Sequence, residues 1–300
     1  MVFRAIPANS RWAGLFFCLA IGLFDLLLLL ILLLRPIDWT KFVLSVLLLG
    51  TLPLLIHLIY RTWSLFSLEY WVDRNAVTIS WAGIRQAIPL YRIERIIYGK
   101  VTDLGQPTLW HWPASHLRNG QTLSMKALRL YATRPLNECI LLELEESVIA
   151  LSPEEGERFI EIVQERYALG PAIDVSDVQR PDSLIQRGWH ALAELDIVSV
   201  SLLFIGIVGV IILFGTLMIR FPNLPGDLVM RYNAEGLPEM IRNKAWLFLL
   251  PTIGLMSWMI NGIWGGWMAS RDQMVGAYML WGGAVIVQAV SLLALIALMP

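Results

Sequence analysis

Five long apolar runs, separated by polar segments, dominate the pattern of the chain. Each run approaches the roughly 20 helical residues that cross a hydrocarbon core of about 30 Å. The pattern predicts five membrane-spanning helices at 12–34, 42–60, 197–219, 245–269 and 275–299. The polar remainder, 61–196, is too long for a loop and has about the length of one domain.

Between 66 and 152 the apolar positions recur with a period near two, and turn residues separate the runs. This pattern predicts about seven short strands at 66–72, 76–81, 84–90, 92–99, 126–133, 139–146 and 147–152. Trp71 and Trp81 are expected to fill the interior that these strands enclose.

A helix is predicted directly after the last strand. Ser152 is a natural N-cap, Pro153 suits the first helical position, and Glu155 completes a capping box. Gly170 ends the helix. Its apolar stripe consists of Phe159, Ile160, Val163 and Tyr167. We therefore predict a small, partly open all-β barrel of about seven strands, capped by this helix.

Three stretches of this domain resemble a known family. They are EYWVDRNAVTISWAGIRQAIPLYRIERI, LYATRP at 130–135 and IALSPEEGERFIEIVQER at 149–166. They are similar to the bacterial pleckstrin-homology-like domain of multi-span membrane proteins, over about 66–168. The resemblance implies a seven-stranded barrel with a C-terminal helix, and a role in binding or scaffolding rather than catalysis.

A second stretch, FPNLPGDLVMRYNAEGLPEMIRNK at 221–244, contains an L-P…N-x-x-G…K pattern. It resembles a short motif of uncharacterised bacterial membrane proteins, some of which are linked to toxin immunity or signalling. Arg231 or Tyr232 stands near the histidine that is usual there. From the residues alone, 227–232 is predicted to be a short strand and 233–236 a turn, because Asn and Gly accept positive φ.

The chain thus divides into four parts. Residues 1–60 form an N-terminal transmembrane hairpin, 61–170 the pleckstrin-like domain, 171–196 a linker with a juxtamembrane helix, and 197–300 three further spans with an outer loop at 220–244. Because 61–196 carries 14 Lys and Arg residues, the positive-inside tendency places this segment and the N-terminus in the cytoplasm. The expected location is the bacterial plasma membrane.

Composition supports the membrane class. Hydrophobic residues make up 57% and charged residues 16%, against about 45–50% and about 25% in soluble domains. A net charge of −1 gives no reason to expect nucleic acid as a partner. Two cysteines and four histidines show no metal-binding spacing, and no catalytic motif is present. We therefore expect no enzyme activity, no cofactor and no metal.

Charge is unevenly distributed within the predicted domain. Residues 61–100 carry a net charge of +3, whereas 138–195 carry −9. Arg85, Arg92 and Arg95 are the candidate lipid-facing residues, because clustered cations attract anionic headgroups. A solvated basic face and a specific headgroup pocket are the alternatives.

Asp25 lies in the middle of the first span, and Gln288 of the fifth span lies at about the same depth. A carboxylate there costs roughly 2.5–3.5 kcal/mol on insertion scales. A proton or ion relay needs more than one ionisable group at depth, so a polar contact between spans is the favoured interpretation.

The sequence predicts a non-enzymatic multi-pass membrane protein. Its pleckstrin-like domain is expected to bind or scaffold protein or lipid headgroups at the inner leaflet. The lipid bilayer, anionic headgroups, other membrane proteins and a second copy of the chain are the candidate partners. The alternative is a small transport or immunity-type membrane protein in which the barrel regulates the spans.

Overall fold

The computed structural model describes residues 1–99, 102–103, 105–122, 124, 126–170, 195–233, 235 and 237–299. The chain divides into two compact units, Met1–Phe24 with Thr51–Gln186 and Asp25–Gly50 with Arg187–Pro300. The predicted juxtamembrane helix of the linker falls outside the described residues.

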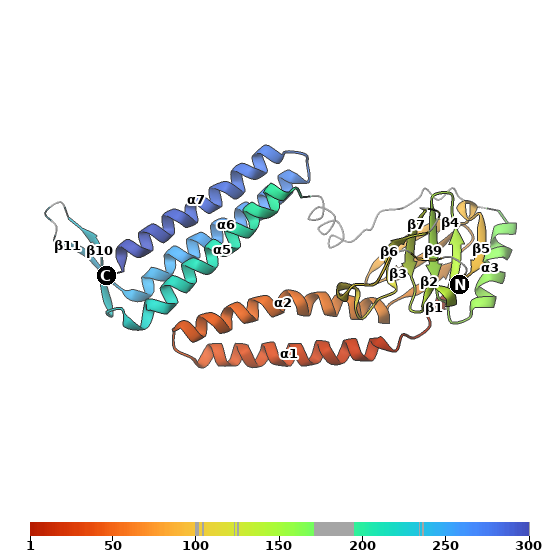
Figure 1. Cartoon of the computed structure of the whole chain (residues 1–300), viewed down its shortest axis with the longest axis horizontal. Coiled ribbons are helices and arrows are strands. Elements are labelled where there is room, and N and C mark those ends of the chain that lie inside the picture. The colour runs from red at the N-terminus through yellow and green to blue at the C-terminus, as the bar shows by residue number, and fades with distance from the viewer. Residues whose placement is uncertain are drawn as a thin grey trace. The chain divides into compact units, whose positions relative to one another are not determined.

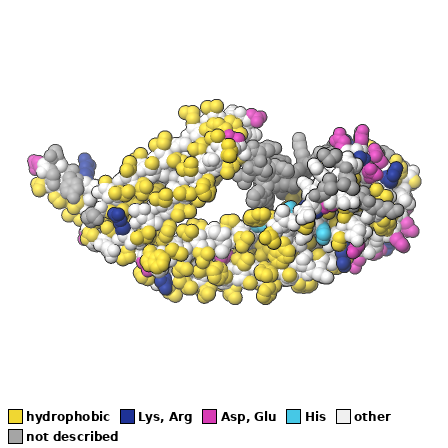
Figure 2. Space-filling model, viewed as in Figure 1, with side chains coloured by type: hydrophobic (Ala, Val, Ile, Leu, Met, Phe, Trp, Pro, Cys, Tyr) yellow, Lys and Arg dark blue, Asp and Glu magenta, His cyan; other side chains and the backbone are white. Residues whose placement is uncertain are grey.

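Among the described residues, five helices are long and apolar enough to cross a membrane, which confirms five long apolar helices where the spans were predicted and suggests membrane insertion. They are α1 (Ser10–Leu34), α2 (Trp39–Phe66), α5 (Ile197–Arg220), α6 (Leu249–Ala269) and α7 (Met274–Leu298). Figure 2 shows hydrophobic side chains covering the visible surface of these helices. The second helix continues past its predicted end at residue 60 and runs directly into the β domain, by which we mean residues 1–8 and 67–168.

The β domain consists of two sheets (Figure 1). The first has the order β1-β2-β3-β4 and comprises β1 (Val2–Arg4), β2 (Glu69–Val72), β3 (Ala76–Trp81) and β4 (Ile84–Pro89). The second has the order β5-β8-β9-β7-β6 and comprises β5 (Arg95–Tyr98), β6 (Leu117–Gln121), β7 (Ala127–Tyr131), β8 (Ile140–Glu143) and β9 (Ser147–Leu151).

The predicted all-β domain is confirmed, but no closed barrel is found among the described strands, which form two sheets. The strand β4 ends at Pro89, which has no N–H to donate to a neighbouring strand. The chain then turns through the short helix η1 (Leu90–Arg92) into β5, which pairs with β8 in the other sheet. The sequence pattern also missed β1, whose three residues are too few to show a period.

One hydrophobic core lies between the two sheets and α3 (Gly156–Ala168). It contains residues of both sheets, and Phe159 of α3 is fully buried in it. The Phe159 ring meets Phe3 of β1 edge to face at 5.3 Å, a favoured geometry for aromatic pairs. The N-terminal strand is therefore part of the domain core.

The predicted capping box at Ser152 is wrong. The helix α3 begins at Gly156, and its N-cap residue Glu155 makes no side-chain cap. Ser152 is buried, and its hydroxyl oxygen accepts from the Thr133 N–H at 2.9 Å. A partner 19 residues away along the chain has therefore replaced the local cap that the sequence suggested.

The two tryptophans that are predicted to fill the domain interior differ in their burial. Trp81 is 6% exposed and belongs to the core, which confirms its prediction. Trp71 is 43% exposed, and its ring lies 5.9 Å below the Arg85 guanidinium. The alternation of β2 places Tyr70 and Val72 in the core, so Trp71 points outward.

In the second unit, α5, α6 and α7 pack through small residues and buried polar groups. The Gln288 side chain of α7 is 3% exposed, and its Nε2 donates to the carbonyl oxygens of Gly206 at 3.0 Å and Gly254 at 3.4 Å. A Cβ on Gly209 would lie 2.2 Å from the Gln288 Oε1. Glycine is therefore required there for α5 and α7 to approach each other.

A β-hairpin follows α5. The strands β10 (Asp227–Tyr232) and β11 (Pro238–Asn243) pair antiparallel, which confirms the predicted strand at 227–232. The Asn233 Oδ1 accepts from the Leu237 N–H at 2.8 Å and so closes the turn. The Lys244 Nζ donates to the carbonyl oxygens of Phe221 at 3.1 Å and Leu224 at 3.0 Å. Both motif residues thus have structural roles.

Candidate functional site

Arg61 joins α2 to the β domain. Its side chain is 9% exposed. The Nη2 donates to the carbonyl oxygens of His111 at 2.7 Å and Ala114 at 2.6 Å, and the Nη1 donates to that of Leu117 at 3.1 Å. A planar guanidinium presents donors in a fixed fork, and here that fork holds the loop 105–117 against the helix.

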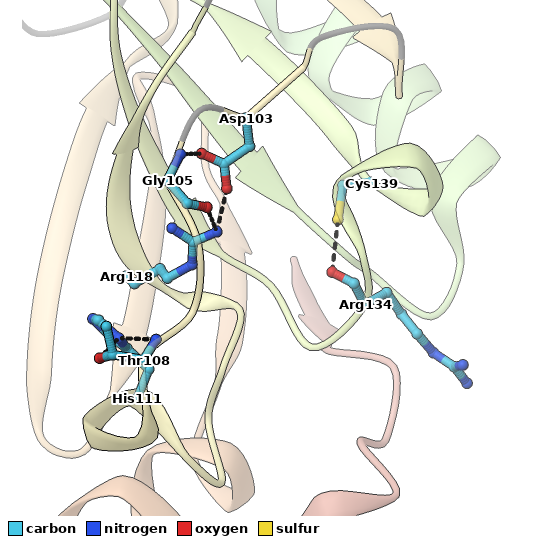
Figure 3. A network of polar contacts seen from close by, with 7 residues as sticks. All are labelled: Asp103, Gly105, Thr108, His111, Arg118, Arg134 and Cys139. Carbon is cyan, nitrogen blue, oxygen red and sulfur yellow. Dashed lines mark hydrogen bonds and ion pairs between the residues drawn. The ribbon is translucent and has the colours of Figure 1, made fainter.

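Further contacts hold the same loop. Figure 3 shows Arg118 bonded to the Asp103 carboxylate and to the Gly105 carbonyl oxygen. Beside them, the Thr108 N–H donates to the His111 Nδ1 at 3.2 Å. The loop is therefore fixed both within the β domain and on α2.

The first turns of α1 hold the loop from the other side. The Ser10 hydroxyl donates to the Pro113 carbonyl oxygen at 2.8 Å. A Cβ on Gly14 would lie 2.7 Å from both the Pro113 ring and the Thr62 hydroxyl. Just before α1, the Ile6 N–H donates to the Ser152 carbonyl oxygen at 2.9 Å. Both helices are thus built into the β domain.

A pocket of about 290 Å³ opens where α1 enters the β domain. We call it the helix-end pocket. Its polar side chains come from Asn9, Ser10, Ser115, His116, Thr133 and Arg134. Figure 3 shows the Arg134 side chain extending away from Cys139, whose Sγ donates to the Arg134 carbonyl oxygen at 3.4 Å.

The electrostatics of the helix-end pocket favour an anion. Its described lining includes Arg134 and no Asp or Glu. The N-terminus of a helix carries a partial positive charge, and α1 begins at Ser10 in the pocket wall. Burial and the nearby Arg118 guanidinium lower the pKa of His116.

A larger cleft of about 530 Å³ lies elsewhere on the β domain. Arg92 and Arg129 line it together with Glu94, Glu145 and Glu146. The Leu90 N–H, just before Arg92, donates to the Asn75 carbonyl oxygen in the β2–β3 turn. The α2 end meets the sheet at the opposite β3–β4 turn, where the Ala82 N–H donates to the Ser67 hydroxyl. This cleft therefore lies at the end of the sheet opposite to α2, and it carries mixed charge.

The structure does not bring the three predicted arginines together. Arg85 lies over Trp71 and belongs to the cross-strand row Arg4, Glu69, Ser80 and Arg85 of the first sheet. Arg92 lines the 530 Å³ cleft, whereas Arg95 lines a third cleft beside α3.

The two predicted intramembrane residues are both buried. Asp25 is 6% exposed and shares a buried face of α1 with Leu28 and Leu32. Gln288 bonds α5 and α6 as described above. Among the described residues, no group of His, Cys, Asp and Glu is arranged to hold a metal ion.

Sequence reasoning missed Arg61, Arg134 and Ser10. Arg61 lies directly after the predicted end of the second span at residue 60. That place was a signal, because a charge next to a span is expected to find partners or reach water. No local signal pointed to Arg134, because its pocket is assembled from residues 8–10, 113–116 and 132–135.

The two-sheet arrangement with a C-terminal helix can be compared with known families. Residues 68–167 match the family described as bacterial PH domain. We call this part the PH-like domain; the match includes His116 and Arg134 of the helix-end pocket but not α1 or Arg61. Neither a curated protein nor a solved structure matches the chain. The chain combines a PH-like domain with several apolar helices, which is compatible with a membrane protein that carries a PH domain.

Proposed function

We propose that this chain is a non-enzymatic, multi-pass bacterial plasma-membrane protein whose PH-like domain binds anionic lipid headgroups at the inner leaflet. The observation that carries the proposal is the helix-end pocket, which has a cationic and polar lining and lies where α1 enters the domain.

The position of the pocket matches the headgroup layer. Trp12 of α1 and Trp63 of α2 are both exposed, and indole rings favour the membrane interface. Ser10 precedes Trp12 by two residues, or about 3 Å of helix, on the side of the PH-like domain. This closeness to the interfacial tryptophans supports a pocket at the level of the lipid phosphates.

The chemistry of the pocket suits a phosphate. An Arg guanidinium forms charge-assisted bonds with phosphate oxygens, and a helix N-terminus adds a favourable partial charge. The Arg92 cleft is less suitable, because three carboxylates share its lining. A domain fixed to both α1 and α2 also keeps its pocket at constant depth.

The proposal is tested with the full chain in nanodiscs of phosphatidylcholine with increasing phosphatidylglycerol. Native mass spectrometry counts the lipids that remain bound. One Lys or Arg near the membrane surface contributes about 1 kcal/mol to binding anionic lipid. The reversal Arg134→Glu changes the charge by two and so costs about 2 kcal/mol, which should lower the preference for phosphatidylglycerol by about 30-fold. Arg158→Glu, an equal charge change on an exposed residue of α3, is the matched control.

An unchanged lipid preference in Arg134→Glu contradicts the proposal. Equal losses in Arg134→Glu and Arg158→Glu also contradict it, because they indicate attraction by overall charge rather than by the pocket.

A further inference from the structure

The loop that Arg61 holds continues along α1 and α2 past the pocket. Its residues Trp112 and Trp110 contact Phe17 and His57. The Trp112 ring meets Phe17 edge to face at 5.3 Å, and the Trp110 ring meets His57 at 5.2 Å. We propose that 109–113 is an intramembrane loop which, with α1 and α2, forms a groove for one lipid acyl chain.

The depth of the loop follows from the length of α1. The helix ends at Leu34, and the charged Arg35 follows. A hydrocarbon layer of about 30 Å takes about 20 helical residues. Counted back from Leu34, the layer begins near Leu15. Phe17 and Ile21 then lie about 3 Å and about 9 Å inside it.

Contacts between α1 and α2 place the loop at the same depth as the length of α1 does. Trp12 meets Phe66 edge to face at 5.8 Å, at the interface level. His57 precedes Phe66 by nine residues, or about 13 Å of helix. The contact between His57 and Trp110 is therefore well below the tryptophan level.

Several backbone groups of the loop have the partners that entry into hydrocarbon requires. Irregular backbone is tolerated at that depth only where the protein satisfies its polar groups. The Trp110 carbonyl oxygen lies 2.9 Å from the His57 Nε2, and the His111 carbonyl oxygen accepts from Arg61. The N–H groups of His111 and Trp112 donate within the loop, to the carbonyl oxygens of Thr108 and Leu109.

The outward side chains of the loop also suit hydrocarbon. Leu109 is 94% exposed and Trp110 is 67% exposed. Adjacent large apolar residues exposed on a fixed loop indicate an apolar partner. At this depth the partner is lipid.

The groove between the loop and the helices has a volume of about 400 Å³. Its walls include Phe17, Ile21, Leu54, His57, Trp110 and Trp112, and its described lining contains no Asp, Glu, Lys or Arg. The His57 Nε2 is engaged by the loop carbonyl. An acyl chain is the occupant that fits, because the groove is apolar and opens within the hydrocarbon layer.

The test uses the full chain in nanodiscs of phosphatidylcholine that carries a photoactivatable diazirine in its acyl chain. After irradiation, peptide mass spectrometry locates the cross-links. Labelling is expected on 109–113 as well as on α1 and α2. Ile21→Trp should fill the groove and lower labelling of 109–113 at least fivefold, whereas Leu30→Trp, on the exposed surface of α1, should leave it unchanged.

Labelling confined to α1 and α2 would overturn the proposal, because the loop would then lie in water. If the loop were labelled at the full level in Ile21→Trp, the claim that the groove holds the acyl chain would be overturned. If that variant does not fold, Leu54→Trp fills the groove from α2. The lipid is zwitterionic, so Arg134→Glu should not change this labelling, and failure here is distinguishable from failure of the headgroup proposal.

Discussion

Arg61→Met removes the guanidinium that holds the loop 105–117 while keeping most of the apolar side chain. Three carbonyl oxygens lose their donor. An unsatisfied buried acceptor costs about 1–3 kcal/mol, and three give about 3–9 kcal/mol. Part of this cost is offset, because the methionine variant no longer pays the desolvation free energy of a buried guanidinium. We therefore expect the loop to open more easily by about 3 kcal/mol, at the lower end of this range.

Hydrogen exchange in nanodiscs measures this opening directly. A change of about 3 kcal/mol corresponds to more than 100-fold faster exchange, since about 1.4 kcal/mol equals a factor of ten. The N–H groups of His111, Trp112 and Leu117 should show it, because each bonds within the loop. Exchange in α3 and in the β3–β4 hairpin should not change.

Two further variants test whether the effect is specific to the Arg61 guanidinium. Arg158→Met removes an exposed ion pair, which should change stability by less than about 1 kcal/mol. Arg61→Lys should restore only part of the protection, because one ammonium cannot replace donors spread over two guanidinium nitrogens. Unchanged loop exchange in Arg61→Met would refute the reasoning that Arg61 holds the loop.

Three further predictions concern the rest of the molecule. Gly209→Ala should lower the melting temperature of the full chain, because the added methyl would overlap the amide oxygen it meets on α7, whereas Gly283→Ala, which has open space around it, should not. Ser152→Ala should speed exchange of the Thr133 N–H by about tenfold or more, because that donor loses a buried acceptor. Cys139 should resist iodoacetamide at pH 8 in the folded chain, because burial raises the pKa of its thiol to about 12 and leaves it neutral.

Each of these has a contradicting outcome. Equal melting temperatures for the two glycine variants would show that the close contact with α7 is not required. If Ser152→Ala exchanged faster at the start of α3 and not at Thr133, Ser152 would act as the helix cap that the sequence suggested, and its bond to Thr133 would be contradicted. Rapid alkylation of Cys139 by mass spectrometry in the folded chain would contradict its burial.

The helices and most strands could be predicted because their signals are local. A run of about 20 apolar residues specifies a span by itself, and the alternation in 76–81 specifies β3. The first strand and the turn of the hairpin at 227–243 could be predicted in the same way, from Asn233 and its neighbours. These features depend on residues that are adjacent along the chain.

The site could not be predicted because its contacts are distant along the chain. Arg61 bonds to carbonyl oxygens 50 to 56 residues away. Ser152 shows the same limit, since its local pattern suggested a helix cap while the N–H of Thr133, just after β7, bonds its hydroxyl. Charge counting cannot assign positions either, since Arg92 and Arg95 are close in sequence but line different clefts.

The central claim is that the helix-end pocket of the PH-like domain contacts anionic headgroups. Hydrogen exchange of the full chain, compared between phosphatidylglycerol and phosphatidylcholine nanodiscs, tests it most directly. The account predicts added protection at 113–116 and 131–135 in the anionic nanodiscs, and no change around the Arg92 cleft. Protection around Arg92 with none at 131–135, or equal exchange in both lipids, would contradict the claim.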